Sequence, residues 1–378
     1  MAEKPIRLGM VGGGNDAFIG AVHRIAARID GQYQLVAGAL SSTPEKARAS
    51  GQALGLAADR IYEDFETMAA AEAARAAGIE AVAIVTPNHM HAPVARAFLA
   101  QGIHVICDKP LTATLTEAED LAKAATQSKA LFVLTHNYTG YPMIRQARAM
   151  VAAGDLGDIR VVQAEYPQDW LTEEVHNKQA DWRVDPKRSG AGGSVGDIGT
   201  HAFNLLSFVS GLQVEALAAD LQAFVPGRAL DDNAHVMLRF QGGARGMLWS
   251  SQVAPGNENA LRLRIYGSKG GLEWAQEDPN YLWHTPFGQP KRLLTRGGVG
   301  ADAAANRLTR TPGGHPEGYL EGFANIYSEA ATLIRAHAAG QAAPAEVHVP
   351  TIEDGLQGMR FIEACVRSSA ADAAWTAL

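Results

Sequence analysis

The stretch Ile6-Arg7-Leu8-Gly9-Met10-Val11-Gly12-Gly13-Gly14-Asn15-Asp16-Ala17 decides the fold of this chain. Strand-forming residues run into a glycine-rich turn that fits the pattern G-x-G-x-x-A, and helical residues follow to about Ile29. In such a turn the first glycine permits a tight bend, the second lets the backbone approach a pyrophosphate, and the helix N-terminus faces the anion. A plain glycine-rich turn is the alternative, but the position at the start of a βαβ pattern favours a dinucleotide loop.

The first part of the chain alternates short apolar segments with alanine-rich helical ones, which is the pattern of a parallel sheet with crossover helices. Thr43-Pro44 predicts the start of one such helix. The further expected strands are 33–40, 81–85, 102–107 and 130–134. We therefore expect an α/β protein in which residues 1–138 form a Rossmann-type, doubly wound parallel sheet.

The pattern changes after residue 138. A helix over 141–153 ends at Gly154, and longer alternating strands are expected at 161–166, 234–241, 245–252 and 261–267. Residues 139–350 are therefore predicted to form an α/β domain with a large, mostly antiparallel, open-faced sheet. Within it we expect a long loop over 292–316 and a helix over 318–338. Residues 351–378 are expected to supply a C-terminal helix that packs back on the first domain.

The composition excludes several classes of function. The chain has 378 residues, a formal net charge of −7 and a pI near 6.0, whereas a nucleic-acid or anionic membrane surface needs clustered basic residues. Its two cysteines form neither a disulfide framework nor a zinc motif. The N-terminus has no signal-peptide core, and no apolar run reaches membrane-spanning length. We expect a soluble cytoplasmic protein with no metal, membrane or nucleic-acid partner.

The glycine loop and the end of the second strand supply the expected contacts to the nucleotide half of a cofactor. We expect contacts to the cofactor from the following residues of the loop: Gly12, Gly14, Asn15, Ala17, Phe18 and Ile19. The second strand ends in Ser41-Ser42 rather than in the carboxylate that grips the ribose diol of NAD, and Lys46 follows one helical turn later. These residues fit NAD or NADP, and the serines could equally serve as a helix cap.

Two further loops follow strands at the same edge of the predicted sheet. Thr86, Pro87, Asn88 and His91 are expected near the nicotinamide end, as is Asn137 after the last strand. His89 and His91 are two residues apart and do not face each other on a helix, so they do not predict a metal site. Asp108-Lys109-Pro110 follows another strand, and its lysine could act on a hydroxyl or carbonyl group. A surface lysine at a helix start is the alternative.

The segment Gly196-Asp197-Ile198-Gly199-Thr200-His201 carries a carboxylate and an imidazole. If a helix begins at Asp197, the residue four positions later shares its face, and His201 is then a plausible general base. Oxidation of a secondary alcohol needs a base, a charge that stabilises an alkoxide, and a hydride acceptor. Lys109 and His201 fit the first two needs, in either assignment. A capping aspartate with a histidine packed on the sheet is the alternative.

These motifs, in this order, resemble those of the glucose–fructose oxidoreductase, inositol dehydrogenase and rhizopine-catabolism (Gfo/Idh/MocA) family. The resemblance covers essentially the whole chain, including Trp182-Arg183 and the hairpin at 266–271. It implies catalytic roles for Lys109, Asp197 and His201, and cofactor contacts from Asp108, Lys109, Trp182 and Arg183. It also implies a homodimer or homotetramer built on the open sheet face. The family's usual Glu-Lys-Pro stands here as Asp-Lys-Pro, which keeps both the carboxylate and the lysine.

The family resemblance implies an NAD(P)-dependent dehydrogenase that acts on a secondary hydroxyl or ketone of a sugar, glycoside or cyclitol. An alternative is an NAD-dependent glycosidase that uses transient oxidation, elimination, water addition and re-reduction. A nucleotide-sensing protein without catalysis is a third reading, against which Lys109, Asp197 and His201 count.

Aromatic and polar side chains are candidates for contacts to the substrate. They are Lys109, Asn137, Tyr138, Trp170, His176, Arg183, Asp197, His201 and His315. Basic residues of the same region could instead bind an anionic substituent of a glycoside: Lys178, Arg183, Lys187 and Arg188. Ordinary solvated loop positions are the alternative for each of them taken singly.

Overall fold

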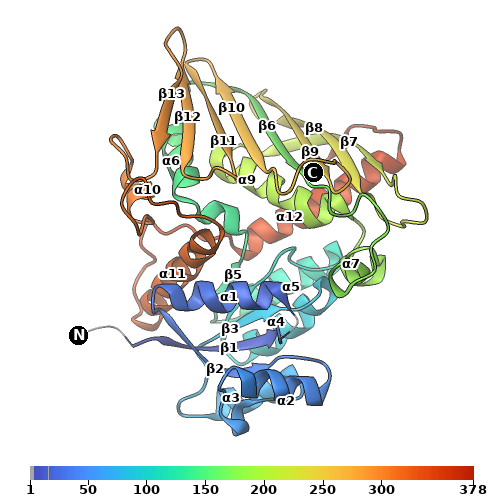
Figure 1. Cartoon of the computed structure of the whole chain (residues 1–378), viewed down its shortest axis with the longest axis vertical. Helices are drawn as coiled ribbons and strands as arrows, with labels where there is room; N and C mark the ends of the chain where they lie inside the picture. The colour runs from blue at the N-terminus through green and yellow to red at the C-terminus, as the bar shows by residue number, and fades with distance from the viewer. Residues whose placement is uncertain (1–3, 16) are drawn as a thin grey trace. The chain divides into compact units, whose positions relative to one another are not determined.

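A computed structural model describes residues 4–15 and 17–378 (Figure 1), with the backbone alone at Lys178. The chain forms two compact units. The first unit comprises the described residues up to Asn137 together with Leu320–Leu356, and the second comprises Tyr138–Tyr319 and Gln357–Leu378. Over the described residues, no helix has the length and apolar character needed to cross a membrane.

The first unit is built on a parallel five-stranded sheet in the order β2-β1-β3-β4-β5. The strands are β1 (Ile6–Gly12), β2 (Tyr33–Ala39), β3 (Ala81–Val85), β4 (His104–Cys107) and β5 (Phe132–Leu134). Every residue of β3 is buried, as expected for a parallel strand covered on both faces. The predicted doubly wound sheet is confirmed.

Helices connect and cover these strands. They are α1 (Phe18–Ile29), α2 (Pro44–Ala53), α3 (Phe65–Ala74), α4 (His91–Ala100) and α5 (Leu115–Gln127), with short 3₁₀ turns at Ala58–Arg60, Asn88–Met90 and Asn137–Gly140. The helix predicted over 318–338 is α11 (Tyr319–Ala338). From Leu320 onward it belongs to the first unit, although the sequence placed it in the second domain.

Buried polar contacts attach α11 to the first unit. The side chain of Tyr327 lies 2.8 Å from His23 Nδ1 of α1, and Tyr33 of β2 donates to the Tyr327 carbonyl at 2.9 Å. Further along, Leu134 N–H donates to the Pro350 carbonyl at 2.9 Å. These pairings join residues about 200 to 300 positions apart in the chain, a separation that the local sequence pattern does not reveal.

The second unit contains a nine-stranded sheet in the order β13-β12-β11-β10-β6-β9-β8-β7-β14. Strands β6 (Ile159–Pro167) and β9 (Arg245–Ser251) pair in parallel, and the other described pairs are antiparallel. The remaining strands are β7 (Val214–Gln222), β8 (Asn233–Phe240), β10 (Arg262–Gly267), β11 (Gly270–Ala275), β12 (Tyr281–Pro286), β13 (Arg292–Thr295) and β14 (Thr376–Ala377). The predicted large, mostly antiparallel sheet is confirmed.

Helices lie along one face of this sheet (Figure 1). They include α6 (Pro142–Ala152), α9 (Thr200–Ser210) and α12 (Ile352–Ala370), while α7 (Lys178–Arg183), α8 (Pro186–Ser189) and a π-helical turn (Val195–Gly199) precede α9. Strand residues alternate accordingly, since Val236 and Leu248 are buried whereas their neighbours Met237 and Met247 are half exposed. The sheet is therefore open on its other face.

Two expectations for the second half need correction. The segment 292–316 is not one loop, because it contains β13 and the short helix α10 (Ala303–Asn306). The C-terminal helix divides between the units: α12 joins the first as far as Leu356 and the second from Gln357. In the second unit, Phe361 stacks on Phe203 of α9 at 4.3 Å between ring centroids.

Candidate functional site

The glycine loop after β1 has the backbone that a nucleotide cradle needs. Gly12 and Gly13 adopt positive φ angles of 78° and 70°, a region that side-chain-bearing residues rarely enter. A Cβ on Gly20 of α1 would lie 2.4 Å from the Gly13 Cα, so the helix and loop touch backbone to backbone. Gly14 N–H donates to the Leu40 carbonyl, and Asn15 N–H to Ser50 Oγ. The loop is thus held open before the N-terminus of α1, where Phe18 is 66% exposed.

Hydroxyl groups follow the end of β2, and a lysine of α2 lies exposed shortly after them. Ser41 Oγ accepts a hydrogen bond from Thr43 N–H at 3.1 Å, and Ser42 and Lys46 are exposed. The other basic residue of α2, Arg48, is bound to Glu63 at 2.6 Å. These positions are compatible with either NAD or NADP.

Two polar groups at the edge of the sheet are suited to hold a ligand. Thr86 Oγ1 and Asn137 Nδ2 are buried and have no hydrogen-bond partner within the described part of the chain. Buried donors without partners are costly, so such groups commonly belong to a binding site. Together with the glycine cradle, they fit a nicotinamide dinucleotide. Asn88 is also buried and lies in the 3₁₀ turn ahead of α4.

His91 occupies a different position from the one expected. Its ring is fully buried, with Nδ1 2.8 Å from the Pro110 carbonyl oxygen and Nε2 2.9 Å from the Thr86 carbonyl oxygen. Both ring nitrogens therefore face the backbone of the two loops, so the side chain joins them and has no nitrogen left for a ligand. Burial lowers the pKa of His91, although the Asp108 carboxylate raises it.

Lys109 lies directly after β4, as the sequence predicts. Its N–H donates to its neighbour's carboxylate, Asp108 Oδ1, at 2.8 Å, and Thr135 Oγ1 donates to the same oxygen at 3.2 Å. The Lys109–Pro110 peptide bond is cis. The ammonium group is close enough to influence His136, whose pKa falls to about 3 because of burial and, second, this positive charge. The carboxyl edge of the parallel sheet thus carries a lysine whose backbone is fixed by Asp108.

In the second unit, the glycine-rich segment ends in a π-helical turn that carries Asp197. The expectation that Asp197 begins a regular helix is wrong, since Val195–Gly199 is π-helical and α9 starts at Thr200. Inserted π turns are rare and occur frequently at functional sites. Asp197 Oδ2 accepts hydrogen bonds from Arg183 Nε at 3.2 Å and from Gln252 Nε2 at 3.0 Å. The carboxylate is 17% exposed, so it is largely buried with these two donors.

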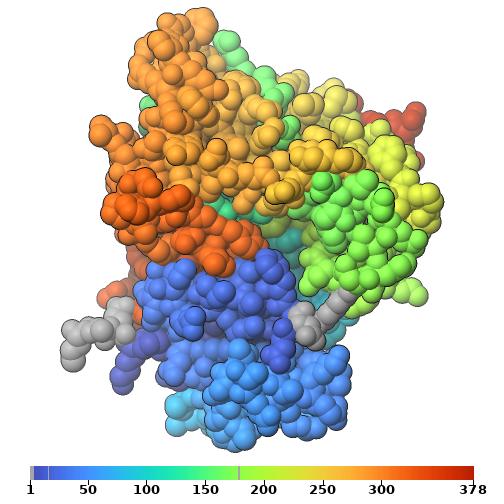
Figure 2. Space-filling model, in the orientation of Figure 1, coloured from blue at the N-terminus to red at the C-terminus, as the bar shows by residue number. Residues whose placement is uncertain are grey.

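Arg183 belongs to an aromatic cluster on a surface segment. Its guanidinium lies 4.4 Å from the Trp182 ring centroid and 5.9 Å from that of Trp170. Figure 2 shows the segment around 170–185, drawn green, beside the yellow residues that follow β9. Gly256 N–H of that neighbour donates to Asp169 Oδ2 at 3.0 Å. The Arg183 guanidinium thus lies against two tryptophan rings and is also paired with the Asp197 carboxylate.

His201, in the first turn of α9, is 8% exposed and lies among tyrosines. Its ring centroid is 4.9 Å from that of Tyr138 and 6.2 Å from that of Tyr166. The two tyrosine hydroxyls are 2.5 Å apart, and Tyr166 also donates to Asn259 Oδ1 at 2.7 Å. Burial raises the pKa of both tyrosines, so they stay neutral near pH 7. The imidazole is packed against neutral hydroxyl-bearing rings.

Other candidates lie on the surface of the second unit. His176 is 80% exposed and faces Glu174 and Asp181, and Lys187 is also exposed. The Lys178 side chain lies outside the described residues. His315 is exposed too, and its carbonyl accepts hydrogen bonds from Arg296 and Thr311.

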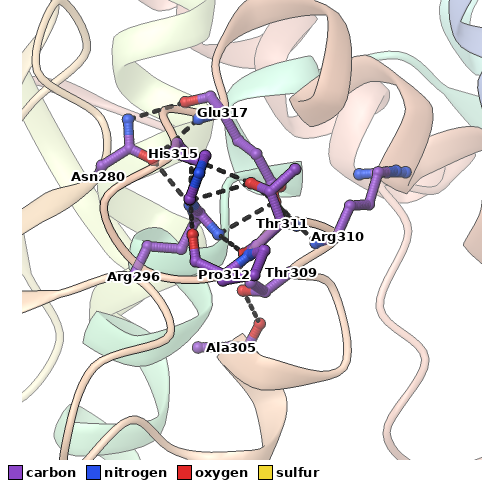
Figure 3. Close-up of polar contacts among 9 residues, drawn as sticks. All are labelled: Asn280, Arg296, Ala305, Thr309, Arg310, Thr311, Pro312, His315 and Glu317. Carbon is purple, nitrogen blue, oxygen red and sulfur yellow. Dashed lines mark hydrogen bonds and ion pairs between the residues drawn. The ribbon is translucent and has the colours of Figure 1, made fainter.

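The loop that carries His315 is held by a buried ion pair (Figure 3). Arg296 Nη1 lies 3.0 Å from Glu317 Oε1, and both side chains are 2% exposed. Glu317 Oε1 also accepts the N–H groups of Arg310 and Thr311, while Arg296 Nε donates to Asn280 Oδ1. The end of the segment predicted as a long loop is therefore tied to residues that directly precede β12 and follow β13.

Sequence reasoning missed several residues that contact the predicted ones. Gln252, at the end of β9, and Tyr166, at the end of β6, carry no motif of their own. Their role follows from strand pairing, which brings both strand ends beside the π-helical turn and α9. Among the described residues, no group of three or more His, Cys, Asp or Glu is arranged to hold a metal ion.

The comparisons with known proteins agree with this geometry. The family model for "Oxidoreductase family, NAD-binding Rossmann fold" matches residues 6–137, and that for "GFO/IDH/MocA C-terminal domain" matches residues 144–273. The chain is 37% identical to an uncharacterized oxidoreductase, YfiI, of Bacillus subtilis, covering 99% of this chain and 97% of that protein.

Similar solved structures extend the comparison. An oxidoreductase from Sinorhizobium meliloti is 64% identical, with a TM-score of 0.92 and 99% of each chain covered. An inositol dehydrogenase homolog from Azotobacter vinelandii, complexed with NAD⁺, is 39% identical, with a TM-score of 0.97 and coverage of 99% of this chain and 98% of that one. An inositol dehydrogenase homolog from Azotobacter vinelandii complexed with NADH and myo-inositol is 38% identical, with a TM-score of 0.94 and coverage of 99% of this chain and 98% of that one.

Proposed function

Because the chain belongs to the GFO/IDH/MocA family of oxidoreductases, we propose that it transfers hydride between NAD(P) and a secondary hydroxyl or ketone of a sugar or cyclitol. The resemblance inferred from the sequence motifs is thereby confirmed at the level of the family. The observation that carries the proposal is the carboxyl edge of the five-stranded sheet. There the glycine cradle, the unpartnered Thr86 and Asn137 groups, and Lys109 follow successive strands.

We propose Lys109 and His201 as the acid/base pair, with Asp197 as the third catalytic residue. The nicotinamide ring, when bound, supplies the hydride acceptor. One of Lys109 and His201 accepts or returns the hydroxyl proton, and a positive charge on the other stabilises the developing alkoxide. The pH dependence of turnover in single variants of Lys109 and His201 determines which of the two groups takes the proton.

The charges of the site favour a neutral polyol over an anionic glycoside. The Arg183 guanidinium is paired with the Asp197 carboxylate, so this basic group already has an acidic neighbour. An anionic substituent would compete with Asp197 for the guanidinium. The homolog from Azotobacter vinelandii was solved with NADH and myo-inositol, which supports a cyclitol as the first substrate to test.

The cofactor preference follows from the end of β2. Arg48 is engaged by Glu63, which leaves Lys46 as the basic residue of α2 most suited to meet a 2′-phosphate. We infer that either NAD or NADP can be accepted and that Lys46 sets the ratio between them.

The deciding experiment incubates the purified protein with NAD⁺ or NADP⁺ and a panel of inositols, aldoses, anhydrosugars and aryl glycosides. Reduced cofactor and released aglycone are followed together. Reduced cofactor that accumulates with a polyol supports the proposal and identifies the cofactor. Aglycone release without net reduction would instead establish the glycosidase chemistry and overturn it.

We also propose that the protein is a homodimer or homotetramer joined through the open face of the nine-stranded sheet. Apolar residues occupy one row of this face: Met237 is 53% and Met247 50% exposed, and their strands pair at these positions. Trp283 and Leu293, paired at the far side of the same sheet, are 40% and 43% exposed. An exposed apolar face of this kind marks an interaction surface.

We also propose a cytoplasmic location. The two buried free cysteines are compatible with a reducing compartment.

A further inference from the structure

Two consecutive buried carboxylates precede β8 in the second unit, at Asp231 and Asp232. Asp231 binds the glycine-rich segment ahead of the π-helical turn. Its Oδ1 accepts the Gly193 N–H at 2.7 Å and its Oδ2 accepts the Val195 N–H at 2.8 Å. Its own carbonyl accepts the Ser194 N–H at 2.8 Å. Three successive backbone donors are thus bound by one residue.

The backbone of Asp231 approaches the backbone of Gly193 closely. A Cβ on Gly193 would lie 2.0 Å from the Asp231 carbonyl oxygen, so the two backbones are in direct contact. The donors belong to the start of the helical segment, where N–H groups have no partner within the helix. A carboxylate there satisfies these donors and interacts favourably with the helix dipole. Asp231 therefore acts as an N-terminal cap supplied from another part of the chain.

Asp232 fixes the neighbouring segments. Its carboxylate accepts the Phe224 N–H at 2.9 Å and Arg228 Nη1 at 3.1 Å. Arg228 in turn donates to the carbonyl of Leu171, next to Trp170 of the aromatic cluster. The Asp232 carbonyl accepts the N–H of Gln252 at 2.8 Å. Since the Gln252 side chain donates to Asp197, this backbone contact leads to the carboxylate of the proposed site.

The charge of the Asp231 carboxylate is costly to bury, so stability alone does not explain why this position carries a carboxylate rather than a neutral side chain. Burial and, to a smaller extent, the nearby Asp232 charge raise the pKa of Asp231 to about 6, although the Val195 and Gly193 N–H groups lower it. The Cys365 thiol of α12 also feels this charge, and Arg228 is paired with Asp232. A buried carboxylate without a cationic partner costs free energy that a neutral side chain would not. Its strong acceptor oxygens are the feature that a neutral residue would lose.

We propose that Asp231 is a positioning residue for the acid/base machinery. By binding Gly193, Ser194 and Val195, it sets the register of the π-helical turn and thereby the direction of the Asp197 and His201 side chains. The inference rests on the proposed function, because it assigns catalytic roles to those two residues. A displacement of about 1 Å at such a position can lower a rate about 100-fold.

The test compares Asp231→Asn with Asp120→Asn, which places the same substitution at an exposed position of α5. An asparagine of equal size has one acceptor oxygen for the two N–H groups and presents an NH₂ group to the second. We expect kcat to fall about 10- to 100-fold, with the substrate KM within about threefold and the cofactor Kd within about twofold of the wild-type protein. The midpoint of thermal unfolding at pH 7 is expected to change little, because the loss of one acceptor for a buried N–H group opposes the removal of a buried charge. Asp120→Asn is expected to match the wild-type protein in every measurement.

A kinetic isotope effect separates positioning from partial unfolding. With a substrate deuterated at the reacting carbon, the isotope effect on kcat is expected to increase in Asp231→Asn, because hydride transfer becomes more rate-limiting. A smaller folded fraction would lower kcat and leave the isotope effect unchanged. A kcat within twofold of the wild-type value, or a reduced kcat with an unchanged isotope effect, would overturn the proposal.

A His201→Ala variant assayed in parallel keeps the two levels of the argument distinct. A His201→Ala variant with near-normal turnover would refute the proposed acid/base role. An inactive His201→Ala variant beside a near-normal Asp231→Asn variant would refute only the positioning role. For a protein that releases aglycones without net reduction, the same comparison is read from the release rate.

Discussion

His91 connects two loops through its imidazole ring, and the protonation state of the ring determines which loop receives a hydrogen bond. A neutral imidazole has one N–H group, yet both ring nitrogens lie within 2.9 Å of carbonyl oxygens. Burial lowers the pKa of this histidine, so the ring is neutral at pH 7 and donates to only one carbonyl at a time. The tautomer therefore determines whether the Thr86 loop or the Pro110 loop is held. The imidazolium form would hold both.

We expect His91→Ala to weaken the first unit and its affinity for cofactor. Removal of the ring leaves buried carbonyl oxygens without a donor, which costs about 1–3 kcal/mol in unfolding free energy. Urea denaturation and a titration with reduced cofactor measure the two effects. The matched control is His89→Ala, at a half-buried position two residues away, where a change below about 0.5 kcal/mol is expected. Equal losses in both variants would contradict the bridging role of His91.

Lys109→Ala is expected to abolish turnover while cofactor binding is retained. Loss of a general acid/base group typically lowers the rate about 10²- to 10⁴-fold. Steady-state kinetics on the substrate found in the panel measure kcat, and fluorescence of bound reduced cofactor gives its Kd. Lys123→Ala, which removes an exposed lysine of α5, serves as the control. Turnover of Lys109→Ala at the level of the control would show that another group performs the chemistry.

At the scale of elements, the strands of the first unit were predictable because parallel strands are buried on both faces and read as continuous apolar runs. The predicted 81–85 coincides with β3, and 6–11 falls one residue short of β1. The π-helical turn was not predictable, since the N–H groups at its start are bound by Asp231, which lies more than 30 residues further along the chain. The segment 292–316 was misjudged for a similar reason. Its glycine- and threonine-rich composition is typical of a loop, while its order comes from one buried ion pair.

That ion pair supplies a prediction for the second unit. Glu317→Gln leaves the buried Arg296 guanidinium without a counter-charge, and we expect a loss of about 3–5 kcal/mol in unfolding free energy. Tryptophan fluorescence during urea denaturation reports on this unit. Glu273→Gln is the matched control, because its pair with Lys291 has the same distance of 3.0 Å but lies on the surface. Its expected effect is below about 1 kcal/mol. A smaller loss in Glu317→Gln than in the control would disprove the importance of burial.

At the scale of the whole molecule, the two units are expected to respond oppositely to acid. Burial lowers the pKa of His23 and His104 to about 4 and that of His136 to about 3, and all three lie in the first unit. Below pH 6.5 the unfolded chain binds protons that the folded unit does not, so stability is complete above pH 6.5 and falls toward pH 4. For His23 alone the loss amounts to about 3 kcal/mol. The raised pKa of Asp231 gives the opposite slope in the second unit between about pH 6 and 4.

Hydrogen exchange at pH 7 and pH 5, followed by mass spectrometry, measures both units in one sample. Peptides from β1 to β5 are expected to lose protection on acidification before those from β6 to β10. A His23→Phe variant should reduce the pH dependence of the first unit. Parallel loss of protection in both units would count against the histidine explanation.

The open sheet face gives a prediction about assembly. Met247→Glu places a charge in the centre of the apolar row, next to Met237 on the paired strand. We expect the oligomer to dissociate into monomers, since burial of an unpaired charge is costly. Light scattering coupled to size-exclusion chromatography measures the mass. Gln127→Glu adds the same charge at an exposed position of α5 and should leave the mass unchanged. A monomeric wild-type protein would contradict the proposal directly.

The division of the first unit between residues up to 137 and residues 320–356 has a consequence for biosynthesis. A ribosome must translate the second unit as far as Tyr319 before the partner of His23 and Tyr33, which is Tyr327, leaves the exit tunnel. The N-terminal unit therefore cannot complete its core during translation ahead of the unit that follows it. For the same reason, a single cut at residue 137 would not yield a complete cofactor-binding half, and a chimaera of two such proteins would need at least two junctions.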